Sequence, residues 1–226
     1  MPMLVRNIGD FLVGTPENPR LTEKDREALL ALANEELEEE LIDLMDEADR
    51  IAKPVALFAV CPVEAGGIVN GVTVGSTLVE EKLQGKGRAI PYIATCGREL
   101  EAWSEQYRGD YLCEFWADEI KKRFLMQGYV SLREYLKETY RVSGHMAALN
   151  PGSLPGWPIS GQKELFRILG GPEYVRDTIG VTYSDSFLMT PTKSISGILF
   201  ESETFYENCQ HCPLERCPNR RAKRID

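Results

Sequence analysis

Leucines recur at helical spacing in the first quarter of the chain. The apolar positions that follow this spacing are Leu29, Leu30, Leu37, Leu41, Leu44, Met45 and Ile51. Thr22 and Asp25 form a capping box in front of them, and Pro54 closes the segment. The pattern predicts helix through about residue 52, with a break near Asn34. We therefore expect a helical N-terminal part over residues 1–52.

Short apolar runs separated by turn residues come next. "VALFAV" after Pro54 predicts a buried strand, and "GGIVNGVTVG" has the alternation and the glycines of a hairpin. A short helix is expected around "TLVEEKLQ". "RAIPYIATCG" then predicts another strand, which ends at Cys96 and Gly97.

From Arg98 to Tyr140 the apolar spacing is again helical, with breaks expected at Gly109 and Gly128. A stripe of large apolar side chains follows this segment and is expected in the core: Leu112, Phe115, Trp116, Ile120 and Phe124.

After Tyr140 the elements become shorter. "HMAALNPGSLPGWPISG" contains a short strand and a loop, and "QKELFRIL" predicts a helix that Ser160 starts. "GVTYSDSFLMTPTKSISGILF" predicts two strands around a Pro-Thr turn. Helices and strands alternate irregularly along the whole chain, which favours an α+β fold. We expect one α+β domain over residues 1–200 and a cysteine-rich tail over residues 201–226.

Composition narrows the functional classes. The chain has 226 residues and a net charge of −9, which argues against nucleic-acid binding by phosphate neutralisation. We find no apolar run of about 20 residues and no signal-peptide pattern at the start, so we expect no membrane span and a cytoplasmic protein. The basic segment "RRAKR" near the end is either a solvated tail or a docking segment for an acidic partner.

The segment "NPGSLPGWPISG" cannot be a helix, because its prolines remove backbone donors and fix φ. Two interpretations remain open. A rigid loop of this kind, with Trp157 as an apolar wall, suits a flat ligand of adenine size bound through backbone hydrogen bonds. Alternatively, it is a packed connector between a strand and a helix.

Two ordered motifs in this region resemble a known family. "PGWPIS" precedes a helix, and Ser186, Phe187, Met189, Pro191, Ser194, Ser196 and Gly197 then follow with the spacing S-F-x-M-x-P-x-x-S-x-S-G. Both motifs resemble the reactivation domain of cobalamin-dependent methionine synthase, over roughly residues 150–200. The resemblance implies an α+β fold with a twisted mixed or antiparallel sheet. It also implies a binding site for S-adenosylmethionine formed by Leu154, Pro155, Gly156, Trp157, Ser194, Ser196 and Gly197.

The resemblance further implies a role beside a corrinoid protein. In that family S-adenosylmethionine methylates the cobalt of cobalamin after a one-electron reduction, and an electron donor such as flavodoxin or ferredoxin supplies the electron. The domain positions the methyl group, so no catalytic side chain is expected. The family's loop arginine, which would pair with the ligand carboxylate, aligns with Gly152. Arg141 or Lys193 is the expected substitute.

Three of the six cysteines lie within nine residues near the C-terminus, at Cys209, Cys212 and Cys217. In a reduced compartment this cluster favours an iron–sulfur cluster or zinc, although a chain without metal stays open. A fourth ligand would come from Cys61, Cys96, Cys113 or His211, and Cys96 at a strand end is the preferred one.

Three functions compete at this stage. The first is an accessory protein that reactivates a corrinoid methyltransferase, with a cysteine-bound cluster passing the electron. The second is a non-catalytic scaffold with a zinc-bound tail. The third is a conventional methyltransferase that uses S-adenosylmethionine, which would show a glycine-rich strand-to-helix turn followed by an acidic residue. No such turn stands out in the sequence.

Overall fold

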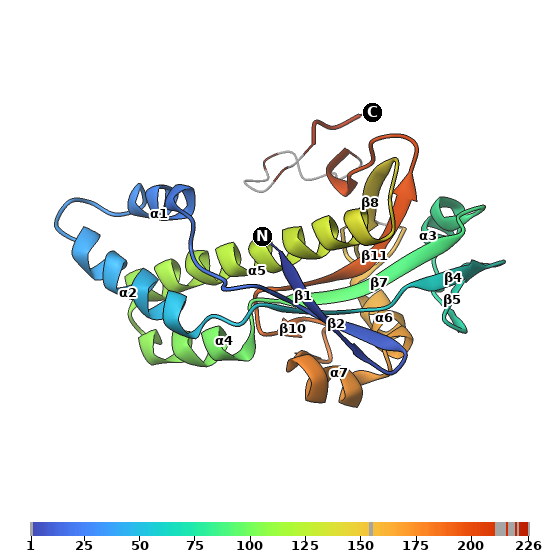
Figure 1. Ribbon diagram of the computed structural model, residues 1–226. Helices are drawn as coiled ribbons and strands as arrows, with labels where there is room; N and C mark the ends of the chain where they lie inside the picture. The colour runs from blue at the N-terminus through green and yellow to red at the C-terminus, as the bar shows by residue number, and fades with distance from the viewer. Residues whose placement is uncertain (1, 154–155, 211–215, 217–219, 221, 226) are drawn as a thin grey trace.

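A large antiparallel sheet organises the protein (Figure 1). The computed structural model describes residues 2–153, 156–210, 216, 220 and 222–225. The long central strands β7 (Arg88–Thr95) and β11 (Ser194–Ser202) lie side by side, and β8 (His145–Leu149) pairs with the outer side of β11. β3 (Val55–Phe58) pairs with β7 and leads outward to β2 (Phe11–Pro16) and β1 (Met3–Ile8).

Shorter strands complete the sheet structure. β4 (Cys61–Glu64) pairs with the beginning of β7 and continues to β5 (Ile68–Val69) and β6 (Val72–Thr73). A separate pair consists of β9 (Thr182–Tyr183) and β10 (Met189–Thr190). Every pairing between the described strands is antiparallel, and helices lie on both faces of the sheet. The α+β prediction is confirmed.

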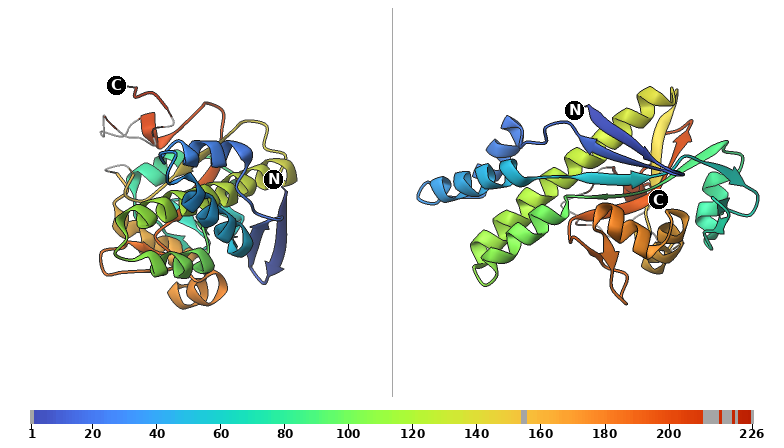
Figure 2. Two further views of the ribbon diagram at one scale, coloured as in Figure 1. Left: turned by 90° about the vertical axis from the view of Figure 1, so that its left-hand side faces the viewer. Right: turned by 60° about the horizontal axis from the view of Figure 1, so that its bottom comes forward.

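The two faces of the sheet carry different helices (Figures 1 and 2). One face packs against α2 (Glu38–Ile51), α4 (Arg98–Ser104) and the 29-residue α5 (Tyr111–Thr139), with α1 (Glu23–Leu30) beyond them. The opposite face packs against α3 (Thr77–Leu83), α6 (Gln162–Ile168) and α7 (Pro172–Ile179). We call these the long-helix face and the short-helix face.

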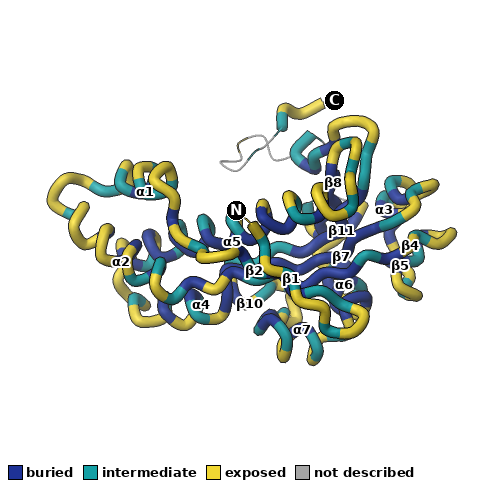
Figure 3. Tube along the Cα trace, in the orientation of Figure 1, coloured by how far each residue is buried: buried dark blue, intermediate teal, exposed yellow. Residues whose placement is uncertain are grey.

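Alternation along β7 divides the core between the two faces. Ile90, Tyr92 and Ala94 belong to the long-helix face, whereas Ala89 and Ile93 belong to the short-helix face. Side chains alternate across a strand, so a strand buried on both faces must be apolar at nearly every position. The centre of the sheet is accordingly buried along its length (Figure 3). No helix among the described residues has the length and apolar character needed to cross a membrane.

Several local predictions are confirmed. The Thr22 hydroxyl and the Asp25 carboxylate form the reciprocal capping box at the start of α1. Residues 31–37 break the helical region between α1 and α2, as expected near Asn34. The break at Gly109 separates α4 and a short 3₁₀ turn from α5. The segments "GGIVNGVTVG" and "TLVEEKLQ" form the expected hairpin and short helix.

Other predictions need correction. Gly128 does not break α5; it is buried where the helix passes Pro54, and a side chain there would lie 3.4 Å from the proline Cβ. Leu112 and Phe115 are 38% and 48% exposed, because the buried face of α5 runs through Cys113, Trp116 and Ala117 instead. Ser160 does not cap α6. It lies inside a 3₁₀ turn over Ile159–Gly161.

The N-terminus also differs from expectation. Residues 3–16 form the β1–β2 hairpin, which extends the sheet, so the helical part begins only at Glu23. The hairpin strands are largely half-exposed, and β1 is an edge strand. Such a strand has little hydrophobic periodicity, which is why the sequence pattern did not indicate it.

Candidate functional site

A cavity of about 440 Å³ lies between the two motifs that the sequence singled out. The loop after β8 and the start of α6 form one side, and the segment from residue 187 to β11 forms the other. Its polar lining consists of Asn150, Ser153, Gln162, Thr192, Ser194 and Ser196. Its apolar lining consists of Pro151, Ile159, Phe187, Leu188, Met189 and Ile195. The volume lies within the range typical of small-molecule sites.

Asn150 fixes the loop to the sheet. It directly follows β8, and its buried amide nitrogen donates to the Tyr92 hydroxyl at 2.9 Å and to the Ser196 carbonyl at 2.7 Å. Gly197 allows this contact: a Cβ at this position would lie 2.3 Å from the Leu149 carbonyl oxygen and 2.7 Å from the Asn150 amide nitrogen. Gly197 thus serves the site by letting β8 and β11 come close together, and it does not itself line the cavity.

Ser196 and Gln162 form a second polar contact across the cavity floor. The Ser196 hydroxyl donates to Gln162 Oε1 at 2.8 Å, and both residues are 3% exposed. This bond joins β11 to the first turn of α6. The two motifs of the sequence are therefore linked through buried neutral side chains.

Gly156 and Trp157 face away from the cavity. The Gly156 carbonyl accepts a hydrogen bond from Ser76 at 2.8 Å, and the Trp157 carbonyl accepts one from the Gly152 amide at 2.8 Å. The Trp157 side chain is 1% exposed and packs over Gly161 in the core of the short-helix face. The Trp157 side chain therefore supports the loop from within the core. The expectation that it forms a wall of the site is not met. Leu154 and Pro155 lie outside the described residues.

The opposite wall is held by an ion pair. Lys121 of α5 is 6% exposed, and its Nζ lies 3.0 Å from Glu101 Oε2 and 3.3 Å from the Thr192 hydroxyl. Glu101 in turn accepts the Thr192 backbone amide at 3.1 Å. Phe187, on the same wall, has a φ of +63°, a strained value for a residue with a side chain. Such strain is common where a backbone is held for binding.

None of the cavity-lining residues that the structure describes is charged. Neither expected substitute for the loop arginine lines the cavity. Lys193 Nζ pairs with Asp118 at 2.7 Å, and Arg141 precedes β8, so the length of that strand separates it from Asn150. Lys121, which contacts the Thr192 hydroxyl, is paired with Glu101. Lys163 Nζ lies 5.3 Å from the ring centroid of Phe187 on the cavity wall.

The backbone explains why glycine stands at position 152. Gly152 has a φ of +80°, and a Cβ there would lie 3.0 Å from the side chain of Ile159. L-residues rarely adopt this conformation. An arginine at this position would therefore strain this loop.

The base of the cysteine-rich tail is attached to the cavity floor. The buried Asn208 side chain donates to Asn150 Oδ1 at 2.9 Å, and in the alternative orientation of its amide it bonds to Ala148 and the Asn150 backbone instead. Tyr206 is 8% exposed, and Lys82 lies 5.0 Å from its ring centroid. Cys209 follows with a half-buried side chain. Cys212, Cys217 and His211 lie outside the described residues.

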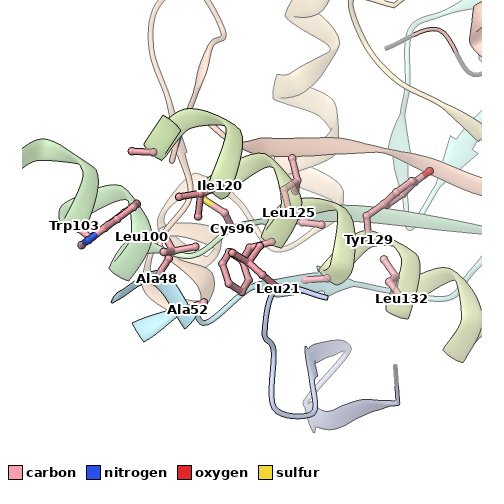
Figure 4. Packing of buried hydrophobic residues seen from close by; sticks show 14 of the residues in the cluster. Leu21, Ala48, Ala52, Cys96, Leu100, Trp103, Ile120, Leu125, Tyr129 and Leu132 are labelled. Atoms are coloured by element: carbon pink, nitrogen blue, oxygen red, sulfur yellow. The ribbon is translucent and has the colours of Figure 1, made fainter. Parts of the chain in front are cut away.

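Cys96 is enclosed in the core of the long-helix face, among Leu100, Ile120 and their neighbours (Figure 4). Its side chain is fully buried, and its thiol points to the Gly97 carbonyl at 3.7 Å. Burial raises the pKa of this thiol to about 12, which disfavours the thiolate that a metal needs. Tyr206 packs on the opposite face of the sheet. Cys96 is therefore unsuited to be the fourth ligand.

The other two candidate thiols are buried as well. Burial raises the pKa of Cys61 to about 11 and that of Cys113 to about 12. Within the part of the chain that the structure describes, no group of three or more histidine, cysteine, aspartate or glutamate side chains could hold a metal ion.

Comparison with solved structures supports the resemblance seen in the motifs. The chain matches the MetH reactivation domain bound to AdoHcy with a TM-score of 0.58 over 92% of its own length and 84% of that domain. The two sequences are 16% identical. No family model and no curated protein matches the chain. The fold is that of a methionine synthase reactivation domain, as predicted.

A cavity lies between the two motifs, but its lining differs from the predicted set of binding residues. Of the seven predicted binding residues, Ser194 and Ser196 line the cavity, whereas Gly156, Trp157 and Gly197 shape its frame. Asn150 and Gln162 were missed, because a single amide in a loop or at a helix start carries no periodic signal. Their position on either side of the Pro/Gly segment is the one feature that could have indicated them.

Proposed function

We propose that this protein binds S-adenosylmethionine and serves as a reactivation component for a corrinoid-dependent methyltransferase. The observation that carries the proposal is the cavity between the Pro/Gly loop and the serine-containing strand, in a fold shared with a domain that was crystallised with AdoHcy. S-adenosylhomocysteine is what remains of S-adenosylmethionine after methyl transfer, so one cavity serves both.

The neutral lining suits the methyl donor. A sulfonium carries a positive charge, and a cavity without cationic side chains avoids repelling it. The face of the Phe187 ring can also attract a cation, and Lys163 Nζ lies 5.3 Å from the ring centroid. Lys163, beside this ring, is our candidate for the carboxylate partner that the loop lacks.

The chemistry assigned to the protein is positioning. One electron reduces the partner's cobalt(II) to cobalt(I), and the cobalt(I) then takes the methyl group from the sulfonium, releasing S-adenosylhomocysteine. Methyl transfer consumes the cobalt(I) and so draws the unfavourable reduction forward. The protein's contribution is to hold the methyl group in line with the cobalt, which requires no acid or base.

Calorimetric titration under reducing conditions tests the binding step. We expect saturable binding of both S-adenosylmethionine and S-adenosylhomocysteine, and about 3- to 10-fold weaker binding for Lys163→Met if the lysine pairs with the carboxylate. Lys86→Met, on a surface away from the cavity, is the matched control. Methylation of a corrinoid protein from its cobalt(II) form, with a chemical reductant and the methyl donor, tests the full role.

We further propose that Cys209, Cys212 and Cys217 hold a metal centre, either an iron–sulfur cluster that passes the electron or zinc that clips the tail. The attachment of Asn208 supports a fixed starting point for this segment. Iron, sulfide and zinc assays on anaerobically purified protein decide between the two metals. Cys209→Ser should lower the metal content, whereas Cys61→Ala, a buried thiol, should leave it unchanged.

No charged side chain lines the cavity among the described residues, so a second function stays possible: a non-catalytic scaffold with a zinc-bound tail. Zinc without iron, together with no binding of either nucleoside in the titration, would favour this function over reactivation.

A further inference from the structure

Gln162 carries an unused hydrogen-bond donor at the cavity floor. Its Oε1 accepts the Ser196 hydroxyl at 2.8 Å, while its Nε2 has no partner among the residues that the structure describes. The side chain is nevertheless only 3% exposed. Because Gln162 lines the cavity, this amide nitrogen is a donor that a ligand or water in the cavity can use.

The environment of this amide restricts the ligand group that it can bind. The neighbouring polar side chains, Asn150 and Ser196, are already paired with protein groups and are uncharged. A carboxylate or phosphate here would be buried without a cation, which is costly. Ile159, Met189 and Ile195 provide apolar surface in the same cavity. A flat heteroaromatic ring with an acceptor nitrogen at its edge matches both features.

We propose that Gln162 determines specificity for the purine base of the nucleoside, by donating from Nε2 to one acceptor nitrogen of the ring. This inference rests on the proposed function and deepens it, because it places the base at the cavity floor and the charged amino-acid end toward the mouth. Glutamine side chains commonly recognise adenine by hydrogen bonds to its edge.

Ser196 orients this amide. Its hydroxyl donates to Gln162 Oε1 and so fixes the orientation of the amide. In this orientation Nε2 is the atom left to donate to a ligand. Ser196→Ala removes this donor and lets the amide rotate, so that Oε1 can face the acceptor nitrogen. We therefore expect Ser196→Ala to reduce discrimination between bases while Gln162 itself is still present.

The test uses S-adenosylhomocysteine and its 1-deaza, 3-deaza and 7-deaza analogues, in which one ring nitrogen is replaced by carbon. With the wild-type chain we expect one of the three analogues to bind about 5- to 10-fold more weakly than the parent, since one hydrogen bond is lost. With Gln162→Leu the parent should weaken by a similar factor, and that analogue should bind as well as the parent. Gln84→Leu, at the exposed glutamine that caps the C-terminus of α3, should behave like wild type.

The ligand series separates a binding role from a structural one. A variant that only loosens the fold weakens all four ligands together and keeps the wild-type ratio between them. Equal affinity of the wild type for all four ligands, or an unchanged ratio in Gln162→Leu, overturns the role of Gln162 and leaves the proposed function standing. If the wild type fails to bind S-adenosylhomocysteine at all, both proposals are wrong.

Discussion

The two faces of the sheet solve the same packing problem in different ways. The long-helix face is closed mainly by one continuous 29-residue helix, whose buried side chains contact the strands directly. The short-helix face is closed by helices of seven and eight residues joined by glycine-containing loops, and its loops are fixed by buried amides and hydroxyls. The cavity borders the first turn of α6, on the second face. A site that needs polar groups in its floor is more easily built where short elements meet than beneath a long apolar helix.

The largest expected effect comes from the long-helix face. Trp116→Ala removes a fully buried ring from α5 and should lower the free energy of unfolding by about 3–5 kcal/mol. Denaturant unfolding measures the loss. Phe115→Ala, at the adjacent but 48% exposed position, should cost far less. Binding of S-adenosylhomocysteine by the folded fraction should be unchanged in both variants. A loss of binding in Trp116→Ala beyond its unfolded fraction would contradict the division between the faces.

Gly197→Ala should affect stability and binding together. The added methyl group would overlap the Leu149 carbonyl and the Asn150 amide, so we expect a loss of about 1–3 kcal/mol and a displaced loop. Thermal unfolding and ligand titration measure the two effects. Gly87→Ala is the matched control, since a Cβ at Gly87 meets nothing within 4 Å. Normal affinity in Gly197→Ala would show that the loop does not depend on this close approach.

Lys121→Met tests the contact between α5 and the Thr192 wall of the cavity. The substitution keeps the length of the side chain but removes the charge that holds Glu101 and Thr192. We expect a loss of about 1–2 kcal/mol in stability, since a mostly buried carboxylate loses its partner while Thr192 continues to donate to it. Ligand affinity should fall through movement of the Thr192 wall. Lys122→Met, whose partner Glu119 is on the same helix, is the control.

The smallest effect is a pH dependence on the long-helix face. Hydrogen bonds from Trp103 and Tyr107 lower the pKa of Glu47. A lowered pKa in the folded state stabilises the protein above the carboxylate's unfolded pKa, and this contribution is lost as the pH falls through the folded value. Unfolding measured between about pH 6 and pH 3 should therefore show a shallower acid decline in Glu47→Gln than in wild type. Parallel curves would show that these bonds do not favour the charged form.

The difference between the faces also explains what the sequence could predict. Trp116, Ile120 and Phe124 repeat with helical spacing, so the core of α5 was predicted correctly from periodicity. The ordered motifs around residues 150–200 predicted the fold, and the candidate cavity lies between them. The direction of Trp157 was not predictable, because a proline-rich loop has no repeating pattern that distinguishes an inward side chain from one that lines a cavity. Asn150 and Gln162 depend on partners far away in the chain, Tyr92 and Ser196, which no local spacing reveals.

The contact between Asn208 and Asn150 indicates that the folded domain continues past residue 200. Cutting the chain after residue 200 would look harmless from the composition, yet it would uncover Phe200, which packs against Tyr206, and would remove Asn208, which contacts Asn150 in either orientation of its amide. A shortened protein intended for crystallisation should therefore keep residues through Cys209. Because Asn208 contacts Asn150, a partner that displaced the start of the cysteine segment would also disturb the loop that borders the cavity.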